Sequence, residues 1–302
     1  MEQRRTFFEE QRRNGRDSIL LAIVVSLILF GLVYTFAYIF APQDLIIVLP
    51  ISAVLIIIYT WASYQYGDQI VIAATGARLA EGDEYIYLNN VSEGLSLAAG
   101  MPMPKIYVID SPEINAFATG KDPEHSSIAV TAGALQKLNR AELEGVVAHE
   151  MSHIRNRDIQ FMTYVTVLVG LVSILSYIIR RWSWVGGSRR RSRDRGSGSF
   201  EGAVIIFGLI LAIVAPIAVA LVQYAISRRR EYMADASGVE LTRFPEGLAS
   251  ALEKIKNSNQ GKMKVDEAVS PLFISDPNHS ALDAFFATHP PIEDRIKRLR
   301  QM

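Results

Sequence analysis

The chain has 302 residues, half of them hydrophobic, and its 31 basic residues balance 31 acidic ones. This neutral balance gives no support for nucleic acid as a partner. There is no cysteine, which excludes disulfides and thiolate metal ligands, so any metal site must use His, Asp or Glu side chains. Four long apolar runs account for the hydrophobic content and indicate a lipid bilayer as a partner.

The N-terminal part predicts a basic tail and then a membrane hairpin. Residues 1–17 carry five arginines, Ser18 to Ala41 is an uncharged run of 24 residues, and Leu45 to Tyr64 is a second run of 20. Crossing a bilayer takes about 20 helical residues, so both runs are long enough. A cleaved signal peptide would have an apolar core of only about 7–15 residues, so we favour an uncleaved hairpin. The basic tail, and a turn without Lys or Arg, place both outer ends in the cytoplasm.

Residues 65–140 have the mixed pattern of a small α+β unit. Alternating β-branched residues indicate strands, and apolar residues at helical spacing indicate helices. We expect helices at 73–81, 90–99 and within 131–140, and strands at 105–110, 115–120 and 127–131. An edge strand of this sheet could pair with an extended peptide. The equal alternative is a purely structural sheet.

The stretch from Ala141 to Asp158 predicts a helix around which the chain is organised. It contains no proline, and its apolar residues recur at helical spacing. His149 and His153 are four residues apart, so they lie on one face of that helix. Two imidazoles placed in this way can hold one zinc ion, and the neighbouring Glu150 can accept a proton from the attacking water. The alternative is a helix that carries two ordinary histidines by chance.

Residues 159–226 predict a second apolar hairpin around a basic loop. The runs at 159–179 and 202–226 flank residues 180–200, which are rich in Arg, Gly and Ser and contain seven arginines. If this hairpin crosses the membrane, its arginines lie on the side opposite the zinc helix, against the positive-inside tendency. Three explanations stay open: the hairpin is partly embedded, the tendency is broken, or the orientation is inverted. We expect four spans with a cytoplasmic site.

A third zinc ligand is expected directly after the fourth apolar run. A hydrolytic zinc site uses three protein ligands and an open position, and His/His/Glu is one of its known sets. Glu231 is the candidate. Asp235 lies one helical turn further on and could accept a hydrogen bond from the non-ligating nitrogen of a zinc histidine. The alternatives are that Glu231 pairs with an arginine such as Arg228, and that Asp235 is a solvated charge.

Together these motifs resemble the HtpX membrane zinc metalloproteases, relatives of the CAAX prenyl endoproteases. The motifs are His149-Glu150-Met151-Ser152-His153 with Arg157-Asp158, Ser227-Arg228 with Glu231 and Ala234-Asp235, His289-Pro290-Pro291 with Arg295, and Asn115 to Gly120. The resemblance covers nearly the whole chain, and the unusually basic loop is its main departure. It implies one zinc ion per chain on His149, His153 and Glu231, with Glu150 as the catalytic base. It also implies an integral membrane endopeptidase that acts in quality control under stress.

The resemblance gives roles to two further groups of residues. His289 either packs before Pro290-Pro291 or reaches the site and stabilises the oxyanion, with Arg295 supporting it. Asn115, Ala116 and Phe117 are expected to bind the substrate, an unfolded or membrane protein, in an extended form.

We therefore predict a mainly α membrane protein with a small β-sheet, two transmembrane hairpins and a zincin-like (gluzincin) catalytic domain. The predicted units are a cytoplasmic tail (1–17), a transmembrane hairpin (18–64), two halves of the protease domain (65–158 and 227–302), and the second hairpin (159–226) between the halves. The location is the inner cell membrane, with the N-terminus and catalytic domain in the cytoplasm. The competing hypotheses are a narrow-specificity prenyl-peptide protease, a non-catalytic zinc-binding scaffold, and a transporter or zinc sensor. The last requires intramembrane charges, which the apolar cores lack.

Overall fold

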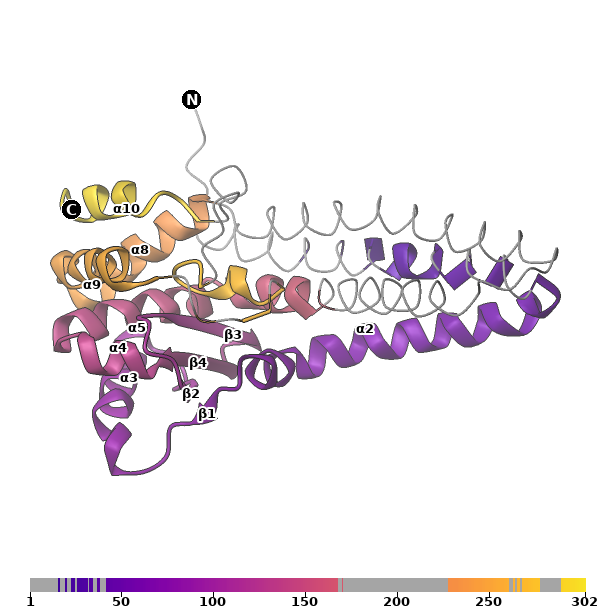
Figure 1. Ribbon diagram of the computed structural model, residues 1–302, viewed down its shortest axis with the longest axis horizontal. Coiled ribbons are helices and arrows are strands. Elements are labelled where there is room, and N and C mark those ends of the chain that lie inside the picture. Colours follow the sequence, from indigo (N-terminus) through magenta and orange to yellow (C-terminus); the bar gives the residue numbers. More distant parts are fainter. Residues whose placement is uncertain are drawn as a thin grey trace, which may run out of the picture.

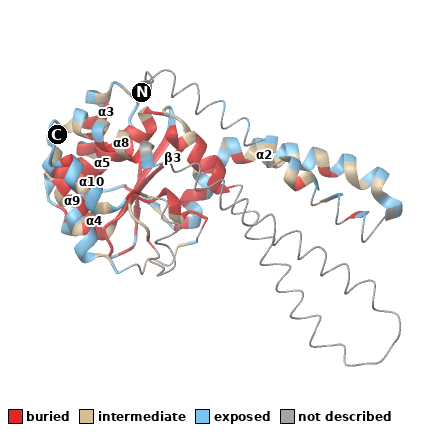
Figure 2. Ribbon diagram, turned by 90° about the horizontal axis from the view of Figure 1, so that it is seen from above, coloured by how far each residue is buried: buried red, intermediate tan, exposed pale blue. Residues whose placement is uncertain are grey.

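A long helix, α2 (Leu45–Thr75), extends away from a body that contains the sheet and the shorter helices (Figure 1). The computed structural model describes residues 42–167, 170, 228–260, 263, 265–266, 268–277 and 289–302, and also 16, 20, 23–24, 26–31, 33–34 and 37–38. Within these residues, α2 is the one helix that is long and apolar enough to cross a membrane. Buried residues concentrate in the body, whereas most of α2 is exposed or half-buried (Figure 2).

The helix predicted at 45–64 is confirmed as part of the longer helix α2, and its crossing of the membrane remains a prediction. Gly76 ends α2 with φ 66°, a left-handed conformation that favours glycine. The predicted helix at 73–81 is therefore wrong beyond residue 75, because residues 78 and 79 form a strand after this glycine. The described residues between 18 and 41 are helical, and Ser26 Oγ lies 3.1 Å from Thr60 Oγ1. The complete hairpin remains a prediction.

The second predicted hairpin falls mainly outside the described part of the chain. Residues 158–167 are helical, but residues 168–169 and 171–227 are not among those described. The membrane crossing of this hairpin and its basic loop therefore remain predictions.

The sheet has four strands in the order β1 (Arg78–Leu79), β2 (Lys105–Ile109), β4 (His125–Thr131) and β3 (Ala116–Asp122). β2 and β4 are parallel, and the other two pairs are antiparallel. The three strands predicted from the sequence are confirmed, and β3 and β4 form the predicted hairpin. β1 was missed because two residues are too short to show a strand pattern.

Strand alternation gives the sheet two buried faces. Ile106, Ile128 and Val130 belong to one core, whereas Phe117 and Ala129 belong to the other. Successive side chains of a strand point to opposite faces, so a sheet with both faces apolar must lie between two layers. The first layer contains α3 (Ile86–Ala99), α5 (Arg140–Arg155) and α9 (Pro245–Ser258), and the second contains the end of α2 and the helical residues 161–167.

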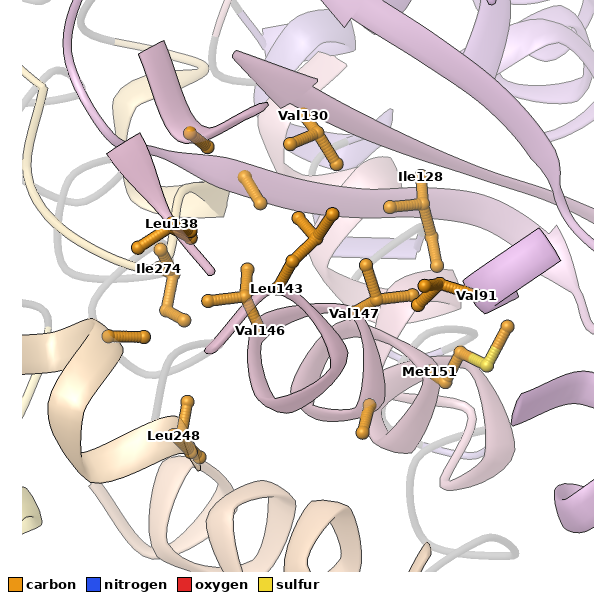
Figure 3. Packing of buried hydrophobic residues seen from close by; sticks show 14 of the residues in the cluster. Val91, Ile128, Val130, Leu138, Leu143, Val146, Val147, Met151, Leu248 and Ile274 are labelled. Atoms are coloured by element: carbon orange, nitrogen blue, oxygen red, sulfur yellow. The ribbon is translucent and has the colours of Figure 1, made fainter. Parts of the chain in front are cut away.

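The first layer is built around α5 (Arg140–Arg155), whose residues 145–154 are all buried. Leu143, Val146 and Val147 of this helix point towards Ile128 and Val130 of β4 (Figure 3). The helices around it are α3 (Ile86–Ala99), α4 (Ala132–Lys137), α8 (Arg228–Thr242), α9 (Pro245–Ser258) and α10 (Ile292–Leu299), with the 3-10 turns η1 (Pro42–Asp44), η2 (Asp83–Tyr85) and η3 (Ser270–Leu272).

Glycines in α5 and α8 allow the helices of this layer to approach closely. A Cβ on Gly145 would lie 2.6 Å from the Leu248 nitrogen of α9. A Cβ on Gly238 of α8 would lie 3.2 Å from the His149 nitrogen. Gly145, a weak helix former, thus stands where α9 leaves no space for a side chain.

Candidate metal centre

α5 holds the two histidines of the predicted motif on a rigid, capped helix. The Asn139 side chain accepts a hydrogen bond from the Glu142 amide, and the Glu142 carboxylate accepts one from the Asn139 amide, which completes a capping box. Lys254 of α9 also donates to this carboxylate at 2.7 Å. The predicted helix at 141–158 is thus confirmed over most of its length, and it presents His149 and His153 with ring centroids 4.8 Å apart.

α8 brings Glu231 to these histidines. Glu231 Oε2 lies 3.6 Å from His149 Nε2, and Glu231 Oε1 lies 3.5 Å from His153 Nε2. One ligand atom from each residue can be chosen so that all three lie within 4.8 Å of one another. All three side chains are buried. The structure therefore brings together the His/His/Glu group that the sequence motifs indicate.

Each histidine has a carboxylate on its other ring nitrogen. Asp235 Oδ1 lies 3.0 Å from His149 Nδ1, as expected for that residue. Asp158 Oδ2 lies 3.2 Å from His153 Nδ1. This contact was not predicted from the sequence, although Asp158 belongs to the Arg157-Asp158 motif named above. Because both Nδ1 atoms face carboxylates, both Nε2 atoms are directed towards Glu231.

Arg295 of α10 joins α8 to the site from a fully buried position. Its Nε and Nη2 atoms donate to the two oxygens of Asp235 at 3.0 and 2.7 Å. Its Nη1 atom lies 3.3 Å from Glu231 Oε2 and also donates to the Ile274 carbonyl at 3.2 Å. We expected Arg295 to support His289, whereas its contacts are with Asp235 and Glu231.

His289 also lies at the site. Its Nδ1 atom is 3.5 Å from Glu231 Oε2, and the side chain is 12% exposed. Within the described residues, neither ring nitrogen of His289 makes a hydrogen bond. A polar ring that reaches the site with its hydrogen-bonding capacity unused is available to a bound molecule.

Asn115, Ala116 and Phe117 lie at the start of β3 and are fully buried. The outer edge of β3 is covered here, because Phe117 forms an antiparallel bridge to Phe273 and Ile274 donates to the Ala116 carbonyl at 2.9 Å. The side-chain amide of Asn115 is also engaged within the chain, since its Nδ2 atom donates a hydrogen bond to the Ser275 carbonyl at 2.9 Å. The strand edge that we expected to pair with a peptide substrate is therefore already paired with residues 273–275 of the same chain.

Burial and the neighbouring charges give the two glutamates of the site different acidities. Burial raises the pKa of Glu150 above its ordinary value, although His149 and His153 oppose this effect. Burial would also raise the pKa of Glu231, but the charge of His289, together with His149 and His153 at 3.5–3.6 Å, outweighs burial and holds that pKa well below the usual range. Glu231 is therefore the stable anion of the site, and Glu150 is the carboxylate that takes up a proton more readily.

The residues at this centre fit a divalent metal ion. Two neutral imidazoles and one carboxylate form a donor set that zinc and similar ions take in hydrolytic sites. Within the described residues, Glu231 Oε2 is buried without a hydrogen bond, although three cationic or imidazole groups lie 3.3–3.6 Å from it. A buried carboxylate oxygen in this condition is an available ligand.

Comparisons with known proteins agree with this geometry. Residues 84–302 match the model of "Peptidase family M48". The chain is 46% identical to a "Protease HtpX homolog" of Caldanaerobacter subterraneus subsp. tengcongensis over 99% of both chains. A protein of the same description from Thermoanaerobacter pseudethanolicus is also 46% identical over 99% of both chains.

A solved structure shares the fold. The structure of Ste24p from S. mikatae superposes with a TM-score of 0.50 at 22% identity, over 94% of this chain and 66% of the longer Ste24p chain. The match to the family covers more than half of the chain, and the two homologues extend it to nearly the full length. The chain therefore belongs to peptidase family M48 and is a metallopeptidase.

Proposed function

We propose that this peptidase is a membrane-bound zinc endopeptidase that cleaves unfolded or damaged proteins, including membrane proteins, in quality control under stress. The observation that carries the proposal is the grouping of His149, His153 and Glu231 within 4.8 Å, beside the buried Glu150. The names of the homologues support a protease of the HtpX type. The competing idea of a non-catalytic scaffold has no support, because the chain is a member of a peptidase family.

His149 and His153, through their Nε2 atoms, and Glu231 would hold one zinc ion. When bound, that ion polarises the scissile carbonyl and lowers the pKa of water. Glu150 accepts the proton of the attacking water and later delivers it to the leaving amine. The raised pKa that burial gives to Glu150 suits this exchange, because a base of very low pKa would hold a proton poorly.

The remaining residues bind and orient the reacting peptide. His289 donates a hydrogen bond to the oxyanion that forms at the scissile carbonyl, a role supported by its ring nitrogens, which make no hydrogen bond to the described residues. The substrate lies extended along β3 near Asn115, Ala116 and Phe117. Residues 273–275 cover that edge, so the substrate pairs there only after they move aside. Backbone pairing of this kind gives broad rather than narrow sequence preference.

The site faces the cytoplasm in this proposal, and the chain lies in the inner cell membrane as a multi-pass protein. The apolar α2 supports the membrane location, and the arginines of residues 1–17 support the cytoplasmic orientation.

Cleavage of an unfolded protein tests the proposal. The full chain, purified in detergent with a chelator, is incubated with casein before and after one equivalent of zinc is added. We expect cleavage only after zinc is restored, with fragments from many positions. Cleavage that persists in the chelator would contradict metal dependence. A zinc-loaded, folded chain that cuts only a prenylated peptide would contradict the broad specificity and favour a narrow prenyl-peptide protease.

A further inference from the structure

A tight reversal after α5 carries Asp158 back to the second histidine. The helix ends at Arg155, Asn156 caps it, and Arg157 then adopts φ 58°. A left-handed conformation is uncommon and strained for a residue with a side chain. Asp158 follows at once and begins the next helical stretch. The backbone is thus strained at Arg157, whose conformation sets the direction of Asp158.

Asp158 divides its two oxygens between two elements of the metal centre. Oδ2 lies 3.2 Å from His153 Nδ1, and Oδ1 lies 3.8 Å from Arg230 Nε. The aspartate is 3% exposed and Arg230 is 14% exposed at its side chain, so solvent screens this pair little. The guanidinium of Arg230 also lies over the Phe161 ring, 5.0 Å from its centroid.

Arg230 is the residue directly before Glu231 on α8. The contacts from His153 to Asp158 and from Asp158 to Arg230 therefore connect the second histidine on α5 to the part of α8 that carries Glu231. The other histidine has an analogous connection, because His149 contacts Asp235, which is bound by Arg295. Each of these two histidines thus contacts a carboxylate through Nδ1, and each of the two carboxylates contacts an arginine.

We propose that Asp158, held by Arg230, is a positioning residue that sets the ring of His153 so that its Nε2 atom faces the metal. A carboxylate that accepts the Nδ1 proton fixes the tautomer and orientation of a metal-binding histidine and makes it a better ligand. This inference rests on the proposed metal site and adds to it the pair that aligns its second ligand. In this role Asp158 acts through His153.

Competition with a chelating indicator measures this role directly, because it reports metal affinity rather than activity. Wild type and Asp158→Asn, as full chains in detergent, are titrated with zinc against the indicator. We expect the affinity of Asp158→Asn for zinc to fall about 10- to 100-fold. Asp158→Glu, which keeps the carboxylate, should recover part of the loss, and Arg230→Ala should show a smaller loss than Asp158→Asn.

The chain offers a matched control on the β3–β4 turn. Asp122 Oδ1 lies 2.7 Å from His125 Nδ1, and the His125 side chain is 61% exposed. Asp122→Asn removes the same kind of contact away from the centre and should leave zinc affinity unchanged. The visible spectrum of the cobalt-substituted protein provides a second readout, which should change in Asp158→Asn and stay as in the wild type in Asp122→Asn.

The outcomes separate this inference from the proposed function. A wild type that binds no zinc or cobalt overturns both. A wild type that binds zinc, beside a folded Asp158→Asn whose affinity lies within twofold of it and whose cobalt spectrum is unchanged, overturns the positioning role alone. If Asp158→Asn fails to fold, Arg230→Ala decides, and wild-type zinc affinity with an unchanged cobalt spectrum in that variant would overturn the role.

Discussion

Replacing Glu150 with glutamine should reduce casein cleavage about 10²- to 10⁴-fold, the contribution of a positioned general base, while the chain keeps its zinc. Glutamine has nearly the same shape as glutamate but accepts no proton. Glu150 is buried, with 2% of its surface exposed, so solvent cannot easily replace it as the proton acceptor. The ligands His149, His153 and Glu231 are unchanged in this variant.

The measurement pairs the initial rate of casein cleavage with zinc content by atomic absorption. Glu144→Gln serves as the control, because Glu144 lies on the same helix, is 33% exposed at its side chain and contacts Arg140 at 2.9 Å. The control should cleave at the wild-type rate. Turnover of Glu150→Gln within tenfold of the wild type would show that another group accepts the proton.

Replacing Arg295 with methionine should lower the stability of the protease body by about 3–5 kcal/mol, the range for breaking a buried ion pair on one side. Arg295 is 1% exposed and donates twice to Asp235, with Glu231 at 3.3 Å. Methionine fills similar space but leaves both carboxylates buried without their cation. The carboxylates also hold the raised pKa of Arg295 far above physiological pH, so the wild type keeps this charge.

Thermal unfolding in detergent and chelator gives the comparison, because the chelator removes the metal ion, which would otherwise compensate in part for the lost guanidinium beside Glu231. A loss of this size corresponds to a fall in Tm of about 6–20 °C. Arg300→Met is the matched control on the same end of the chain. Arg300 is 42% exposed and pairs with Glu246 at 2.9 Å, and exposed ion pairs contribute little, so its removal should leave Tm nearly unchanged. Equal Tm values for the two variants would contradict the structural role of Arg295.

The residues that share one helix could be predicted from the sequence. His149, Glu150 and His153 lie within a single turn or so of α5, and helical periodicity alone sets their relative positions. Glu231 was found because a hydrolytic zinc site needs a third ligand and the resemblance supplied a motif. The core helix and the β3–β4 hairpin were also predicted, since both have strong apolar patterns.

The contacts made by turns and distant segments could not be predicted. Asp158 faces His153 only because Arg157 is left-handed, and an arginine gives no signal of that conformation. Arg295 reaches Asp235 from 60 residues further along the chain, so no local pattern links them. Residues 273–275 cover β3 through backbone contacts, which leave no alternating pattern in so short a segment.

Zinc K-edge X-ray absorption of the zinc-loaded chain reports the ligands of the metal centre. We expect one zinc ion with two imidazole nitrogens and carboxylate oxygen at about 2.0–2.2 Å. The contribution of the two imidazoles should stay in Glu231→Gln, while the zinc is bound more weakly. A spectrum with one histidine or none, or zinc affinity that is unchanged in Glu231→Gln, would contradict the assignment of His149, His153 and Glu231 as the metal centre.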